Sequence, residues 1–153
     1  MPTNKRAVLK ALITRLSEEL ETLVKAAKAA HEAATHEESK AEDQYDTRGL
    51  ESSYLAAAQI QRAEDLQRQI QHFSVSSEDT HHLITLQNED KETSNYFLTQ
   101  FAGGTKLVID GVTVLVITSE SPIGTELVDR KVGDLLEIQQ RGKRREMEIV
   151  SFL

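Results

Sequence analysis

Apolar residues recur in alternating steps of four and three near the start of the chain, at Leu9, Ile13, Leu16, Leu20, Leu23, Ala27, Ala30 and Ala34. This heptad spacing, called the seam below, is typical of a helix packed lengthwise on another helix. No glycine or proline interrupts the chain between Pro2 and Gly49. A helix of about 40 residues would be roughly 60 Å long. Because so long a helix needs a partner in water, a second helix must lie against it.

A second seam supplies that partner. Its residues step by three, four and three, at Ala63, Leu66, Ile70 and Phe73. No polar linker long enough to separate two domains lies between the seams. We therefore expect a second helix over about 50–73 that folds back antiparallel on the first. Because the seam is used within this hairpin, a monomer is expected.

Side-chain size supports the antiparallel pairing. Leucine and isoleucine open the first helix, and Leu66, Ile70 and Phe73 close the second. At the other end small residues would meet, with Ala27, Ala30 and Ala34 facing Ala56, Ala57 and Ala58. Large residues then pack at the base and small ones at the far end. The turn is expected at 43–49, where Asp46, Thr47 and Gly49 have turn chemistry.

Charge reverses along this predicted hairpin. Residues 1–30 carry six bases and three acids, whereas residues 31–51 carry seven acids and two bases. The acids therefore gather around the turn, at the end of a thin rod; a solvated helix face is the ordinary explanation of such a run. The whole chain has a net charge of -7, which argues against nucleic-acid binding through a bulk basic surface.

The C-terminal half has a different pattern. After a polar linker at 74–80, strand-like runs lie near 83–86, 96–98, 112–117, 135–139 and 146–152. Pro122 can open a brief helix that reaches Val128. We expect an α+β chain with two domains, a helical hairpin over 1–74 and a sheet domain of four or five strands over 75–153.

Several classes of function are disfavoured. The chain has no cysteine, so it has no disulfide or thiolate metal site. It has neither an apolar run of about 20 residues nor a signal-peptide core, which predicts a cytoplasmic protein without membrane contact. The histidines lack metal-site spacing and are expected at surface or linker positions: His31, His36, His72, His81 and His82.

Three stretches carry a family resemblance. They are Ser121-Pro122-Ile123-Gly124 with Leu127 and Lys131-Val132-Gly133-Asp134, the ending Glu146-Met147-Glu148-Ile149-Val150, and Tyr54-Leu55-Ala56-Ala57. Together they resemble the Gre-type transcription elongation factors (GreA/GreB-like), which promote transcript cleavage. Order and spacing match over nearly the whole chain, and the first stretch is the most specific.

The resemblance implies a coiled-coil N-terminal domain and an FKBP-like C-terminal domain without isomerase activity. It implies binding to bacterial RNA polymerase at the rim of the secondary channel, through Ser121, Pro122, Ile123 and Gly124. The hairpin would enter the channel and bring its tip carboxylates to the catalytic Mg²⁺ of the polymerase, where backtracked RNA is cleaved. The factor would itself be no enzyme and would hold no cofactor of its own.

The tip departs from the family pattern, which has an acid, two intervening residues and a second acid after a glycine. Alignment on Tyr54 puts Thr47 and Leu50 in the acidic positions, whereas spacing selects Asp43 and Asp46. Further candidates are Glu42 and Glu51. One or two carboxylates suffice for Mg²⁺, which prefers hard oxygen ligands. Asp43 and Asp46 are therefore the predicted catalytic and transient metal residues.

Two other functions stay open. The altered tip also fits a secondary-channel regulator or inhibitor that does not stimulate cleavage. A peptidyl-prolyl isomerase or chaperone built on the C-terminal domain is disfavoured, because that half has few aromatic residues and no tryptophan to floor a proline pocket.

Overall fold

The computed structural model describes residues 4–35 and 48–153. They form two compact units. One contains the described residues up to Leu12 together with Val75–Leu153, and the other contains Ile13–Ser74. The first helix therefore starts in one unit and continues in the other. The two units are described separately below.

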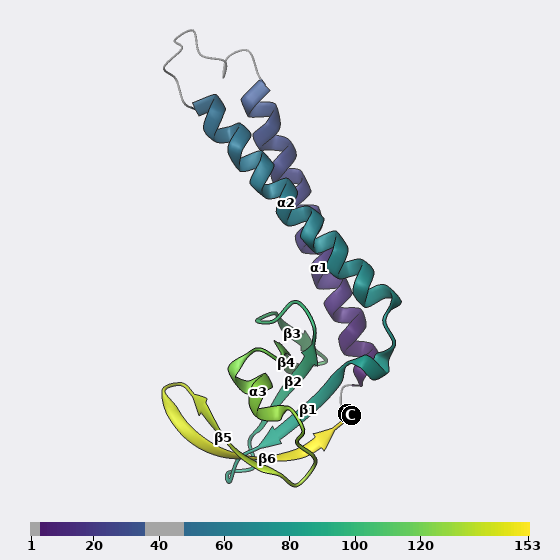
Figure 1. The fold of residues 1–153 in the computed structure, drawn as a ribbon, viewed down its shortest axis with the longest axis vertical. Helices are drawn as coiled ribbons and strands as arrows, with labels where there is room; N and C mark the ends of the chain where they lie inside the picture. The colour runs from purple at the N-terminus through teal and green to yellow at the C-terminus, as the bar shows by residue number, and fades with distance from the viewer. Residues whose placement is uncertain (1–3, 36–47) are drawn as a thin grey trace. The chain divides into compact units, whose positions relative to one another are not determined.

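Two long helices make up the helical unit. Helix α1 spans Lys5–Thr35 and helix α2 spans Arg48–Val75, and they run side by side in opposite directions (Figure 1). A guanidinium nitrogen of Arg62 lies 3.0 Å from a carboxylate oxygen of Glu19, which links the two helices. The predicted antiparallel arrangement of the two helices is thus observed over the part of the chain that is described.

Burial follows much of the predicted seam. Leu16 and Ala27 are buried on α1, and Ala63, Leu66 and Phe73 are buried on α2. These residues lie on one face of each helix because three-residue and four-residue steps return to the same side. In globular proteins, helices of this kind gain most of their stability from such packing.

Two details of the predicted hairpin are wrong. Helix α2 already includes Gly49, which was expected in the turn; residues 43–47 of that turn lie outside the described residues. Ala57 and Ala58 are exposed, although they were expected to face α1. The reason is spacing, because steps of four and three taken backwards from Ala63 reach positions 59 and 56. The side chains of Ala30, Ala34 and Ala56 are not among those described.

The start of α1 buries a different face. Val8 and Leu12 are fully buried, whereas the seam residues Leu9 and Ile13 are only half-buried. Val8 and Leu12 belong to the unit that contains the sheet. The heptad seam alone does not show this shift of one position.

Ion pairs connect this first part of α1 to a short 3-10 helix, Glu78–Thr80, in the same unit. Arg6 Nε donates to Glu78 Oε1 at 2.7 Å, and Lys5 Nζ lies 3.9 Å from Asp79. The hydrogen bond to Glu78, with the attraction between the two charges, raises the pKa of Arg6. The segment 74–80, expected to be a plain linker, is thus partly helical.

The sheet unit is built on one six-stranded mixed sheet of strand order β3-β4-β2-β1-β6-β5. Its strands are β1 His82–Gln87, β2 Thr93–Thr99, β3 Lys106–Ile109, β4 Val112–Thr118, β5 Leu135–Gln140 and β6 Lys143–Phe152. Strands β2 and β4 pair in parallel, and all other neighbours are antiparallel. The α+β class is confirmed, with six strands rather than four or five. The FKBP-like assignment stays a prediction.

The strand that was not predicted is β3, which pairs with β4 across a tight turn. Asp110 and Gly111 join β3 to β4 with φ angles of 50° and 80°. Two residues of positive φ make the tight turn that joins twisted antiparallel strands, and Asp-Gly is a preferred sequence for it. Arg141 and Gly142, with φ of 52° and 75°, join β5 to β6 in the same way.

A short helix, α3, covers one face of this sheet. It spans Pro122–Leu127, as the proline at 122 predicted. The core beneath it is a single cluster of buried residues: Ile84, Leu86, Tyr96, Ile117, Leu127, Leu136, Ile138, Met147 and Ile149. Burial raises the pKa of Tyr96, although hydrogen bonds with Ser94 and Gln140 oppose the shift. Its hydroxyl therefore stays protonated at neutral pH.

His81 departs from the expected surface or linker position. Only 2% of it is exposed. Its Nε2 lies 2.9 Å from Ser76 Oγ, and its ring centroid lies 5.5 Å from that of Phe97. His81 comes just before β1, an interior strand, and its ring packs beside Phe97 of β2. Over the described residues, neither α1 nor any other helix is long and apolar enough to cross a membrane.

Candidate functional site

The predicted polymerase-binding loop forms a tight corner between β4 and α3. Ser121 is the N-cap of α3: its Oγ accepts a hydrogen bond from Gly124 N at 3.0 Å and donates one to Thr118 O at 2.7 Å. Serine is a preferred N-cap because its oxygen satisfies a free backbone N–H. Pro122 occupies the first turn, where its fixed φ suits the helix and its missing N–H has no consequence.

Gly124 is required by close contact with the preceding strand. A Cβ atom at this position would lie 1.8 Å from the carbonyl oxygen of Thr118 and 2.8 Å from Ser121 Oγ. The nearest of these contacts is to backbone, which cannot move aside as a side chain does. Glycine at position 124 thus allows α3 to pack against the end of β4.

The second part of the same motif is also held locally. The carboxylate of Asp134 accepts a hydrogen bond from Lys131 N at 3.0 Å. Gly133 has a φ of 94°, and its N–H donates to Ile149 O at 2.8 Å. This turn fixes the entry into β5 against β6. The Ser-Pro and Gly-Asp elements therefore shape the surface between α3 and β5.

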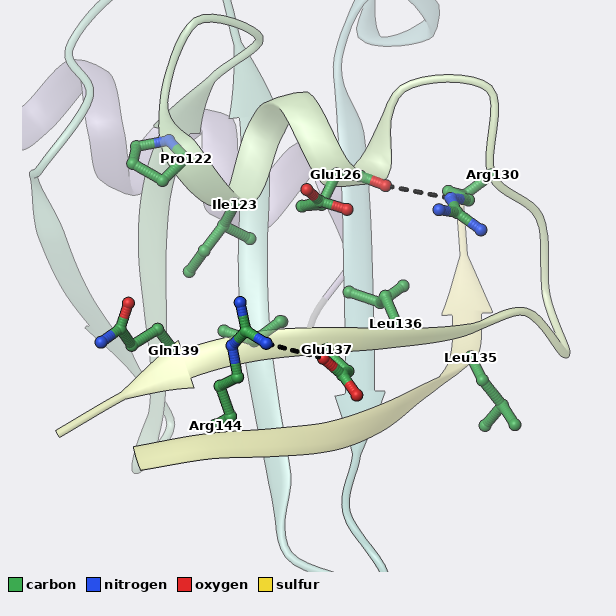
Figure 2. A pocket seen from close by; sticks show the side chains of 10 residues that line it. Pro122, Ile123, Glu126, Arg130, Leu135, Leu136, Glu137, Gln139 and Arg144 are labelled. Carbon is green, nitrogen blue, oxygen red and sulfur yellow. Dashed lines mark hydrogen bonds and ion pairs between the residues drawn. The ribbon is translucent and has the colours of Figure 1, made fainter. Parts of the chain in front are cut away.

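That surface contains a groove of about 440 Å³ between α3 and the start of the β5–β6 hairpin (Figure 2). The residues that line it are Pro122, Ile123, Glu126, Arg130, Leu135, Leu136, Glu137, Ile138, Gln139 and Arg144. Leu136 and Ile138 are buried and belong to the core, so they make its floor. Pro122 is exposed, and 55% of Leu135 is exposed.

Charges of both signs surround this apolar floor. Arg144 lies 3.7 Å from Glu137, with both side chains largely exposed, and Arg130 Nε donates to the backbone oxygen of Glu126 at 3.2 Å (Figure 2). An exposed ion pair of this kind contributes under about 1 kcal/mol. Two acids and two bases leave the rim without net charge. An apolar centre with a polar rim is typical of a protein-binding surface.

The structure separates the four predicted binding residues into two pairs. Pro122 and Ile123 line the groove, whereas the Ser121 hydroxyl is used in internal hydrogen bonds and Gly124 is buried. The main residue that sequence reasoning missed is Leu135. Alternation along β5 could have identified it, because inward Leu136 and Ile138 turn position 135 outward.

The predicted tip residues are not placed. Glu42, Asp43 and Asp46 lie outside the described residues, and Glu51 lies on α2 without a described side chain. Among residues 4–35 and 48–153, no cluster of three or more histidine, aspartate or glutamate side chains is arranged to hold a metal ion. The metal-directed role of Asp43 and Asp46 stays a prediction.

No protein-family model matches the chain, and no curated protein matches it. Solved structures that are similar to it include three of the factor Gfh1. GreA factor homolog 1 (Gfh1) of Thermus thermophilus is 20% identical over 92% of this chain and 94% of that chain, with a TM-score of 0.37. Gfh1 of Thermus aquaticus is 21% identical, and a further structure of the transcription factor Gfh1 is 22% identical. Both cover 94% of each chain, with TM-scores of 0.39.

Proposed function

We propose that this chain regulates transcription elongation by binding bacterial RNA polymerase at its secondary channel, as Gre-type factors do. The observation that carries the proposal is the groove beside the Ser-Pro corner, because the residues that resemble the family motif build it. With this partner, the proposed location is the cytoplasm and the proposed working form is a monomer.

The groove suits the docking of a folded partner. Ser121 and Gly124 fix the corner through hydrogen bonds and close packing, so Pro122 and Ile123 are presented without much conformational freedom. A preorganised surface loses less entropy when it binds. Its apolar floor and neutral rim fit a protein surface better than a nucleic acid, which would require a basic lining.

Replacing Leu135 with aspartate tests this docking. Leu135 is 55% exposed and lies at the edge of the groove, with its side chain directed away from α3 (Figure 2), so a charge there should weaken polymerase binding with little effect on the fold. We expect affinity to fall at least about tenfold, or about 1.4 kcal/mol. Val108→Asp is the matched control, because Val108 is 68% exposed on strand β3, away from the groove. Equal binding by wild type and Leu135→Asp, measured by titration of labelled polymerase, would rule out this docking surface.

The second part of the proposed function, entry into the polymerase channel, belongs to the helix pair. A thin rod can enter a channel that a globular domain cannot, and five acids of 36–47 lie between its two helices in the sequence. We propose that Asp43 and Asp46 act beside the active site of the polymerase. Mg²⁺ held there would stabilise the attacking and leaving oxygens of phosphodiester cleavage. Carboxylates are suitable ligands for it.

Transcript cleavage by a backtracked polymerase measures this role. We expect the wild-type protein to speed release of short 3′ fragments, and Asp43→Ala or Asp46→Ala to return the rate toward that of polymerase alone. Binding should persist in both variants, because the docking groove is unchanged. Glu64→Ala, which removes an exposed acid of α2 outside the tip segment, should retain full stimulation. Undiminished stimulation by both tip variants would exclude these two carboxylates.

A regulator that occupies the channel without cleavage is the second candidate. Alignment on Tyr54 favours it, because Thr47 and Leu50 then stand where the family has acids. Such a protein would slow nucleotide addition and compete with a cleaving factor, and the same assay separates the two outcomes. An isomerase or chaperone function has less support. The residues that line the groove include no aromatic side chain, although a proline pocket needs an apolar aromatic floor.

A further inference from the structure

Basic residues are concentrated at one end of the β5–β6 hairpin. Residues 75–153 contain eight lysines and arginines against 13 acids, and four of the eight fall within 141–145. These are Arg141, Lys143, Arg144 and Arg145, all of them exposed. A local concentration of positive charge on an otherwise acidic domain makes an anionic partner the natural expectation.

A polar concavity of about 290 Å³ lies at this end of the hairpin, next to the turn between β1 and β2. It is distinct from the groove beside α3. Its lining residues are Asn88, Glu92, Thr93, Ser94, Gln140, Arg141, Arg145 and Met147. Two guanidinium groups thus share one small concavity with hydroxyl and amide groups, which donate hydrogen bonds to oxyanions.

One carboxylate in the concavity, that of Glu92, contacts two of the other lining residues. Glu92 Oε2 accepts a hydrogen bond from Asn88 Nδ2 at 2.7 Å and lies 3.6 Å from a terminal nitrogen of Arg145. The distance to Arg145 is that of an ion pair rather than a direct hydrogen bond. The Arg145 guanidinium can therefore still donate to another acceptor. Glu92 lowers the positive charge of the concavity without cancelling it, since Arg141 is also present.

We propose that this end of the hairpin binds phosphate groups of a nucleic-acid strand. A guanidinium matches phosphate oxygens with two parallel hydrogen bonds, and Arg141 and Arg145 are placed to supply two such groups. Lys143 does not line the concavity, so positive charge continues along the hairpin beyond a single phosphate, whereas Arg144 is paired with Glu137 at the other groove. Charge spread over several residues fits a backbone with repeated phosphates better than a small ion.

Binding of the full chain to labelled single-stranded RNA of mixed sequence, over a range of salt concentrations and without polymerase, tests the site. Each phosphate contact contributes about 0.7 to the slope of log affinity against log salt for single strands. Loss of two contacts in Arg141→Gln/Arg145→Gln should therefore reduce the slope by about 1.4. Lys106→Gln on β3 removes one charge at the opposite edge of the sheet and should leave the slope unchanged.

Glu92→Gln gives the opposite expectation and guards against a folding artefact. The substitution removes the negative charge from the concavity and puts an amide of similar shape in its place. RNA should therefore bind to this variant more tightly than to the wild-type protein. Weaker binding by Glu92→Gln, an equal change of slope in Lys106→Gln, or no binding by the wild-type protein would each overturn the proposal. So would a polyglutamate peptide that competes as well as RNA, because the surface would then recognise any polyanion.

Discussion

Gly124→Ala is expected to destabilise the sheet unit by about 3 kcal/mol or more. The added Cβ would lie 1.8 Å from the carbonyl oxygen of Thr118, far inside van der Waals contact. Relief requires α3 to move away from β4, which would also break the hydrogen bond that Ser121 Oγ donates to Thr118 O. Urea unfolding followed by far-ultraviolet circular dichroism measures the loss.

Gly103→Ala is the matched control, because its added Cβ also meets Thr118. There the nearest atom is the side-chain methyl Cγ2 at 3.1 Å, which can shift by a few tenths of an ångström. We expect its stability to stay within about 1 kcal/mol of wild type. If both variants unfold at the same urea concentration, close backbone approach is not the reason for glycine at position 124. Because α3 forms one wall of the groove, Gly124→Ala should also impair the proposed polymerase docking.

Leu66→Ala is expected to destabilise the helix pair by about 2–5 kcal/mol. Leu66 is fully buried on α2, and its removal leaves both lost apolar contact and a cavity. Ile60→Ala on the same helix is the control, since Ile60 is 49% exposed and should lose only about 1 kcal/mol. Thermal unfolding followed by the helical signal at 222 nm compares them. Equal losses would mean that the α2 seam does not stabilise the pair.

The helices and most strands were predictable because their signals are local. Pro122 opens α3 where its fixed φ suits a first helical turn. The apolar, β-branched run of β4 became an interior strand. The strands expected near 135–139 and 146–152 are joined at Arg141-Gly142, where glycine adopts positive φ readily. In each case the chemistry of a few neighbouring residues determines the backbone.

Other features depend on residues far away along the chain. Val8 and Leu12 are buried because the start of α1 belongs with the sheet unit, which a heptad pattern cannot reveal. Strand β3 is short, and its Asp110-Gly111 turn was a local signal that sequence reasoning overlooked. His81 is buried although its polar neighbours resemble a linker. Propensity is a weak guide wherever tertiary contacts decide.

The candidate site shows the same division. Sequence motifs identified the corner at 121–124. They did not show which of its residues line the groove and which hold the corner in place, because hydrogen bonding and burial depend on Thr118 and the end of β4. The groove itself needs Leu135 and Arg144 from the following hairpin. Their juxtaposition with α3 is a product of the sheet order and is not visible as a motif.

The order of strands in the sheet also affects how the chain folds during synthesis. Strand β6, made last of the six, lies inside the sheet between β1 and β5. Strand β1 therefore gains its second neighbour only after every other strand has left the ribosome. Such long-range pairing slows folding, whereas the two helices are complete before β1 has been translated. Nascent chains should consequently carry a formed helical segment beside a sheet that still exposes an unpaired edge.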